Sequence, residues 1–87
     1  MPDYVVEFYL SHPDETAVAL AADHARSAAL ANPTTVHYLR SMFIPEDEVG
    51  FHLFRADSRE LVRDVATRAG LPVGRVIEIV ARPQELT

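Results

Sequence analysis

Four short runs of alternating side chains constrain the fold of this sequence more than any other feature. They are Tyr4–Leu10, Val36–Ile44, Val49–Arg55 and Val76–Val80. Alternation with period two over four to nine residues is typical of β-strands. In each run one set of alternate residues is mainly apolar, and we predict that this set packs on the helices: Tyr4, Val6, Phe8 and Leu10; Leu39, Ser41 and Phe43; Phe51 and Leu53; Ile77 and Ile79.

The second set of alternate residues combines apolar side chains with one ionisable group in each strand. The ionisable groups are Glu7, Arg40, His52 and Glu78. Their apolar neighbours in the set are Val5, Tyr9, Tyr38, Met42, Phe54, Val76 and Val80. A solvated sheet face would be mostly polar, so we expect this face to be covered by a partner or to form a pocket.

Two helical segments separate the strands. The first begins after Ser11 or Asp14, either of which can cap it, and runs to about Ala31 before Asn32-Pro33. Its inward face is small: Val18, Ala21, Ala22, Ala25 and Ala29. The second helix is expected over Ser58–Ala69, because Asp57 and Glu60 have capping-box spacing and Gly70-Leu71-Pro72 is a strong stop. Its inward side chains are Leu61, Val62, Val65 and Ala69.

The resulting order β-α-β-β-α-β predicts an α+β, ferredoxin-like fold. Right-handed crossovers place both helices on one face of a four-stranded antiparallel sheet, with strand order 4-1-3-2. The loop Ile44–Glu48 pairs the second and third strands as a hairpin, which sets Phe43 opposite Val49, Arg40 opposite His52 and His37 beside Arg55. In this register the four ionisable groups form one row across the open face.

Composition limits the class of protein. Eighty-seven residues make a single domain, 1–87, with a tail over 82–87 that is disordered or adds a short edge strand. A core of this size is marginal, and oligomerisation is a common remedy. The chain has no cysteine. Its net charge of -5 argues against nucleic acid and anionic membranes as partners. No apolar run is long enough to span a bilayer and no signal peptide is recognisable, so we expect a cytoplasmic protein.

Several motifs resemble a known family. They are Val6–Leu10, the run from Val36 to Glu48 with its Leu-Arg-Ser and Pro-Glu-Asp-Glu segments, Arg68–Pro72, and Arg75–Glu78. Together they resemble a family of small bacterial domains, common in actinobacteria, of largely unknown function, which includes nickel-binding proteins. The resemblance implies a ferredoxin-like fold, a homodimer and nickel binding, and no catalytic residues. Members often carry cysteine where this chain has Gly50 and His52, although histidine can also ligate a metal.

The best constellation for chemistry is Glu7, His52 and Glu78. Imidazole and carboxylate donors suit nickel, zinc or iron, so these three are the predicted metal ligands. The structural alternative is that Arg40 neutralises Glu7 or Glu78 in a buried interface network. His12, followed by Asp14 and Glu15, offers a second metal site at the helix start, although such a histidine is more often a solvated loop residue. His24 is expected at the surface.

The sequence is compatible with three functions, and the residues alone do not distinguish them. The first is a homodimeric binding protein for a divalent transition metal, nickel by resemblance, with a role in sequestration or homeostasis. The second is a small enzyme of the dimeric α/β-barrel type, an isomerase or cofactor-free oxygenase, with a pocket lined by Tyr9, Tyr38, Arg40, Met42, His52 and Phe54. The third is a structural module. On this evidence an enzyme is less expected than a binding protein.

Overall fold

The computed structural model describes residues 1–80 and contains the predicted elements in the predicted order. They are β1 (Asp3–Tyr9), α1 (Glu15–Leu30), β2 (Val36–Ile44), the short 3-10 helix η1 (Pro45–Asp47), β3 (Val49–Ala56), α2 (Arg59–Arg68) and β4 (Val76–Ile79). Residues 81–87, which include the predicted tail 82–87, lie outside the described residues.

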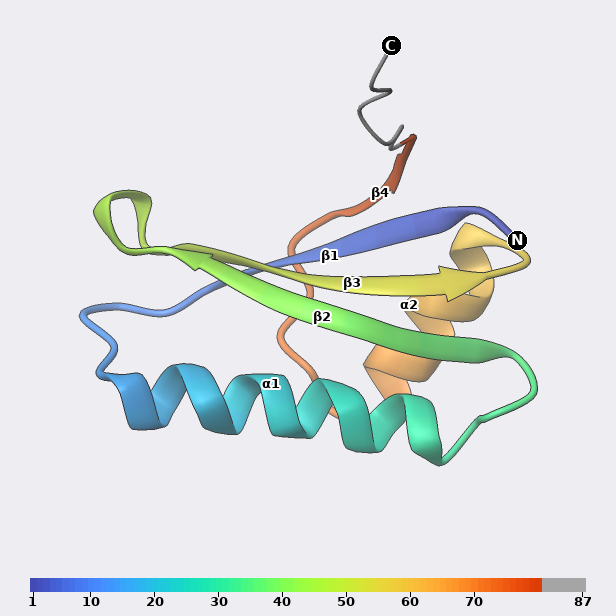
Figure 1. Ribbon diagram of the computed structural model, residues 1–87, viewed down its shortest axis with the longest axis horizontal. Coiled ribbons are helices and arrows are strands. Elements are labelled where there is room, and N and C mark those ends of the chain that lie inside the picture. Colours follow the sequence, from blue (N-terminus) through green and yellow to red (C-terminus); the bar gives the residue numbers. More distant parts are fainter. Residues whose placement is uncertain (81–87) are drawn as a thin grey trace, which may run out of the picture.

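One antiparallel sheet with the order β2-β3-β1-β4 organises the molecule. This is the predicted order read from the opposite edge, so the ferredoxin-like α+β fold is confirmed. Both helices, α1 and α2, lie on one side of the sheet, and no helix of residues 1–80 lies on the other side (Figure 1). None of the helices within residues 1–80 is long and apolar enough to cross a membrane.

The helix ends follow local sequence signals. Asp14 caps α1, because its side chain accepts a hydrogen bond from the backbone N–H of Ala17 at 2.8 Å. For α2 the predicted cap was wrong: Ser58, not Asp57, is the N-cap and accepts from the N–H of Leu61. Gly70 ends α2 with φ +73°, and the following N–H of Leu71 donates to the carbonyl of Ala66.

A β-bulge changes the pairing of β2 with β3. His37 lies opposite Arg55 as predicted, but the register shifts between Tyr38 and Arg40. After this shift Ser41 faces His52, Arg40 faces Leu53 and Phe43 faces Gly50, so the predicted pairs Arg40–His52 and Phe43–Val49 are wrong. One unpaired residue, Leu39, accounts for the difference, and its side chain is exposed rather than packed inward.

The register decides which residues share a face of the sheet. Directly paired residues of antiparallel strands project to the same side. The helix side therefore carries Tyr4, Val6, Phe8, Val36, Tyr38, Ser41, Phe43, Gly50, His52, Phe54, Ala56, Val76 and Glu78. The open side carries Asp3, Val5, Glu7, Tyr9, His37, Arg40, Met42, Ile44, Val49, Phe51, Leu53, Arg55, Ile77 and Ile79. The alternation predicts the reverse for β3 and β4: Phe51, Leu53, Ile77 and Ile79 on the helix side, and His52, Phe54, Val76 and Glu78 on the open side. That part of the prediction is wrong.

The core lies between the sheet and the two helices. Three small residues of α1 are buried in it, Ala25, Ala28 and Ala29, and α2 contributes Val62, Val65 and Ala66. Alanine on α1 lets the helix approach the sheet closely, as its pattern predicted. The strands supply the larger core side chains: Tyr4, Val6, Val36, Phe54 and Val76.

Candidate functional site

The predicted metal ligands Glu7, His52 and Glu78 do not lie together. Glu7 projects from the open side of β1, whereas His52 and Glu78 project from the helix side of β3 and β4. Within residues 1–80, no three histidine or carboxylate side chains gather closely enough to hold a metal ion. The expectation that Glu7, Arg40, His52 and Glu78 share one face is therefore wrong. A ligand role for any one of them stays a prediction.

The predicted pocket is divided in the same way. Tyr9, Arg40 and Met42 lie on the open side, and Tyr38 and Phe54 lie on the helix side, where their rings meet edge to face at 5.9 Å. Phe54 is buried in the core and Tyr9 is exposed. These five side chains therefore do not line one cavity, and the open-face pocket expected for a barrel-type enzyme is not formed by them.

His52 is the most unusual residue of the core. It is 1% exposed, and its ring stacks on Phe8 with 4.2 Å between centroids and 12° between planes. Burial, with a smaller contribution from the nearby His24, lowers the pKa of His52 from 6.5 to about 4. Burial disfavours the charged form, so the ring is neutral at physiological pH.

The Ser41 hydroxyl is the hydrogen-bond partner of the His52 ring, and the Tyr38 hydroxyl is bonded in turn to Ser41. The hydroxyl of Ser41 lies 2.7 Å from Nδ1 of His52, and the hydroxyl of Tyr38 lies 2.8 Å from Oγ of Ser41. The three side chains come from two neighbouring strands, and Ser41 reaches His52 because the bulge places them opposite each other. The result is a hydrogen-bonded chain from the edge strand β2 into the core.

Glu7 is held by a different set of residues. Its Oε1 accepts from the Tyr9 hydroxyl at 2.8 Å, and both carboxylate oxygens accept from the Arg75 guanidinium at 3.2 Å. The Arg75 hydrogen bonds, followed by that of Tyr9, hold the pKa of Glu7 below its usual range. Glu7 is thus a neutralised, buried carboxylate whose partner is Arg75 rather than the predicted Arg40.

A histidine–carboxylate pair lies at the end of the molecule where β1 leaves the sheet. The backbone N–H of His12 donates to Oε2 of Glu48, and Nδ1 of His12 lies 3.6 Å from the same oxygen. Both residues have left-handed backbones, with φ 46° at His12 and φ 52° at Glu48. Such conformations are uncommon outside glycine and concentrate at functional sites. His12 is almost fully exposed, so its ring is accessible to a ligand.

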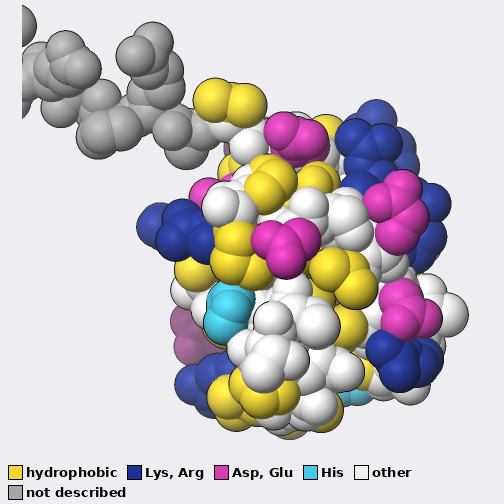
Figure 2. Space-filling model, turned by 90° about the vertical axis from the view of Figure 1, so that its right-hand side faces the viewer, with side chains coloured by type: hydrophobic (Ala, Val, Ile, Leu, Met, Phe, Trp, Pro, Cys, Tyr) yellow, Lys and Arg dark blue, Asp and Glu magenta, His cyan; other side chains and the backbone are white. Residues whose placement is uncertain are grey.

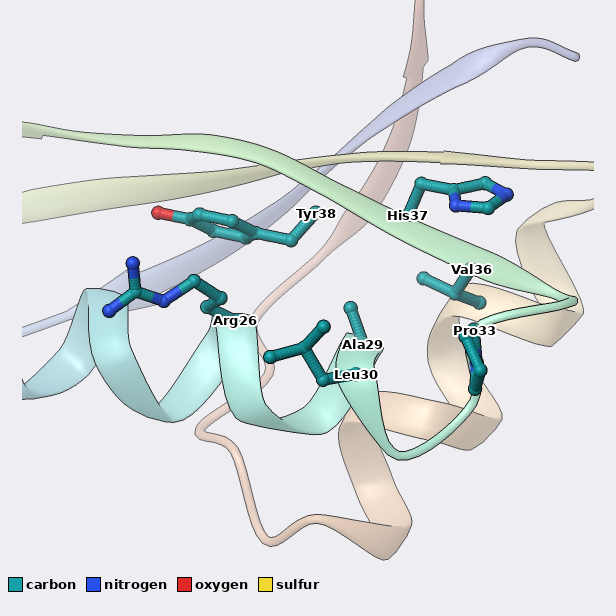
Figure 3. A pocket seen from close by; sticks show the side chains of 7 residues that line it. All are labelled: Arg26, Ala29, Leu30, Pro33, Val36, His37 and Tyr38. Atoms are coloured by element: carbon teal, nitrogen blue, oxygen red, sulfur yellow. The ribbon is translucent and has the colours of Figure 1, made fainter.

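Two pockets lie between α1 and the edge strand β2. The first, of about 250 Å³, is lined by the end of α1 and the start of β2. Figure 3 shows Tyr38 of that pocket lying between β2 and α1, above Arg26 and Leu30, while His37 extends to the other side of the strand. The second, of about 420 Å³, is lined by the beginning of α1 and by Ser41 and Phe43. The Tyr38–Ser41 hydrogen bond joins residues of the two pockets.

Comparison with known proteins now identifies the family. Residues 4–79 match the family described as "Nickel responsive protein SCO4226-like". The chain belongs to this family. The crystal structure of SCO4226 from Streptomyces coelicolor A3(2) matches with a TM-score of 0.70 and 20% sequence identity, over 93% of this chain and 99% of that one, which supports the fold. No curated protein sequence matches the chain significantly.

Because the SCO4226-like family is described as nickel-responsive, we ask which side chains have donor atoms that suit nickel. Imidazole nitrogen and carboxylate oxygen both suit Ni²⁺, and the His12–Glu48 pair places one of each at the surface with no cation beside them in the described residues. His52 fits less well, because Nδ1 is engaged by Ser41 and the ring is packed between Phe8 and Phe54.

Sequence reasoning missed three features of these sites. The sequence pattern gives Ser41 no role beyond the apolar face, offers no partner for Arg75, and places Glu48 in the loop Ile44–Glu48. Arg75 is 68 residues from Glu7, and Glu48 is 36 residues from His12, so no local spacing relates them. One signal was present: Gly50 inside a strand indicates that another group approaches closely, and the Phe8 ring fills the space where its Cβ would lie.

Proposed function

We propose that this protein is a small homodimeric binding protein for a divalent transition metal ion, with nickel as the first candidate and sequestration or homeostasis as its role. The observation that carries the proposal is membership of a family described as nickel-responsive. The cysteine-free composition is compatible with the cytoplasm as the place of action. Glycine-rich phosphate loops and nucleophile elbows are absent from the sequence, so binding is a better proposal than catalysis.

His12 and Glu48 are the proposed protein ligands. The ring and the carboxylate already meet across two loops, and the hydrogen bond from the His12 N–H orients the carboxylate. A metal ion bound by both side chains would link the two loops. Because only the neutral imidazole coordinates, binding should weaken as the pH falls through the imidazole range.

The proposed dimer uses the open side of the sheet. Among the described residues no helix covers that side, and its partly or fully exposed apolar side chains include Met42, Ile44, Phe51, Ile77 and Ile79, while Val5 and Leu53 are each 8% exposed. Met42 and Ile44 are 45% and 42% exposed. Apolar surfaces of this kind on small domains are commonly covered by a second copy.

Charge argues against a nucleic acid as the alternative partner. At the end of the molecule seen in Figure 2, basic and acidic side chains are interspersed with apolar ones rather than gathered by sign. With a net charge of -5 the chain offers little electrostatic attraction to phosphate backbones.

Isothermal titration of the metal-free protein with NiCl₂ tests the proposal. We expect saturable binding that weakens at least about tenfold in His12→Ala and in Glu48→Gln, the range typical for loss of a group that holds a metal. His24→Gln is the matched control, because it removes an imidazole while keeping a donor for the carbonyl of Ala69. Absence of nickel binding by the unaltered protein would overturn the function, and a loss confined to His52→Ala would move the site to His52.

A further inference from the structure

The pocket between the first turns of α1 and the end of β2 has the properties of a small-molecule site. Its volume of about 420 Å³ lies in the range of ligand pockets. Its walls are apolar and come from both elements, chiefly Val18, Ala19 and Ala22 of α1 and Phe43 of β2. The two alanines leave the space that larger side chains would fill.

Ser41 is the polar group that the pocket shares with the core. Its hydroxyl has one proton and two lone pairs. When Ser41 donates to one of its two partners and accepts from the other, the hydrogen-bonded chain through Tyr38, Ser41 and His52 uses its proton and one lone pair. In that arrangement Ser41 offers its second lone pair to the pocket, and a ligand donates a hydrogen bond to it.

The acceptor is held in place before any ligand arrives. His52 is buried and stacked on Phe8, which fixes the position of its Nδ1. Its pKa of about 4 keeps the ring neutral, so the imidazole does not place a positive charge behind the pocket. A fixed acceptor lowers the entropic cost of binding.

The charged side chains that line the pocket favour one class of ligand. The exposed carboxylates of Asp14 and Glu15 line the pocket together with the serine, and no arginine is among the described residues that line it. Asp14 accepts the capping hydrogen bond of α1 with one carboxylate oxygen, Oδ1. Two acids near an apolar cavity repel anions and attract cations.

We propose that this pocket binds a small apolar amine in its ammonium form. The hydrocarbon body packs against Val18, Ala22 and Phe43, and the ammonium group donates a hydrogen bond to Oγ of Ser41 while Asp14 and Glu15 neutralise its charge. The site uses neither of the proposed metal ligands His12 and Glu48, although its lining residue Pro13 follows His12 directly in the sequence.

A titration with 2-phenylethylamine, followed by backbone amide chemical shifts without added metal, tests this proposal. Two probes of similar shape provide the comparison, the neutral 2-phenylethanol and the anionic 3-phenylpropionate. We expect saturable shifts at the start of α1 and the end of β2, and the order amine, alcohol, carboxylate in affinity. Equal affinity of the amine and the carboxylate, or shifts elsewhere on the sheet, would overturn the proposal.

Two variants assign the contacts. Ser41→Ala should weaken amine binding about 10- to 100-fold, the loss expected for one hydrogen bond to a charged group. Ala19→Leu fills the pocket from an exposed helix position, so it should abolish the shifts without touching the His52 contacts. Leu20→Ser, on the same helix but outside the pocket, should bind as the unaltered protein does. Unchanged affinity in Ala19→Leu would place the amine elsewhere and refute the site.

Discussion

Oγ of Ser41 lies 2.7 Å from Nδ1 of His52, so a hydroxyl on an edge strand satisfies a histidine that is 1% exposed in the core. Without this partner the buried ring nitrogen would remain unpaired, which costs about 1–3 kcal/mol. The contact exists because the bulge after Tyr38 moves Ser41, rather than Arg40, opposite His52.

The lowered pKa of His52 predicts acid sensitivity. Its folded pKa of about 4 lies below the unfolded value of 6.5, so the unfolded chain binds the proton more readily. Stability should be full above pH 6.5 and fall as the pH drops toward 4, by an amount on the order of 3 kcal/mol. Thermal melts between pH 4 and 8 measure it, with His52→Asn as the comparison, since asparagine can accept from Ser41 without titrating. An equal pH dependence in both proteins would contradict the assignment.

Arg75 should control the acidity of Glu7. Its guanidinium holds the pKa of Glu7 low, so the stability that this carboxylate contributes is present above the unfolded pKa and lost as the pH falls through the folded one. In Arg75→Met the pKa of Glu7 should rise, and acid unfolding should begin at a higher pH. Carbon-13 NMR titration of the glutamate carboxyls reports the change. Arg63→Met, on the exposed surface of α2, should leave Glu7 unaffected.

Gly50 should not tolerate a side chain. A Cβ at this position would overlap the ring of Phe8, which is itself fixed by stacking on His52. We expect Gly50→Ala to destabilise the protein by about 1–3 kcal/mol, the usual cost of overpacking a core. Urea denaturation measures it, and Leu20→Ala, at a side chain that is 63% exposed, serves as the control. A loss no larger than in the control would mean that the ring moves freely.

Ser58, rather than Asp57, should carry the cap of α2. Ser58→Ala removes the acceptor for the N–H of Leu61 and should cost about 1 kcal/mol. Asp57→Ala should cost clearly less, because Asp57 makes no capping bond to this helix. Chemical denaturation of the two variants side by side decides between them, and the reverse order would restore the capping box expected from sequence.

The proposed dimer makes a prediction for the open side of the sheet. Met42→Glu introduces a charge where the second copy would pack, and the half-exposed position lets the subunit fold. Sedimentation equilibrium should give a dimer for the unaltered protein and a monomer for Met42→Glu. Leu20→Glu, on the outer surface of α1, should stay dimeric. A monomeric unaltered protein at micromolar concentration would remove the dimer from the proposal.

The order and type of the four strands and two α-helices were predictable from the sequence because their signals are local. Alternation marks the strands, Asp14 caps α1, and Gly70-Leu71-Pro72 ends α2, each within a few residues of the chain. The right-handed crossover rule then leaves one arrangement of four strands. The same local signals found an alanine face of α1, of which Ala25 and Ala29 are buried as predicted, while the buried Ala28 was not predicted.

Tertiary structure alone decided which faces of neighbouring strands belong together. Alternation says which residues of one strand share a face, but a shift of one residue in register exchanges the faces. Phe51 and Leu53 are more apolar than Gly50 and His52, so pattern reasoning placed the wrong set of β3 inward. The Phe8 ring needs the space above Gly50, and this packing requirement brings His52 into the core and sets Ser41 beside it. The pairs Glu7–Arg75 and His12–Glu48 likewise depend on distant segments that only the closed fold brings into contact.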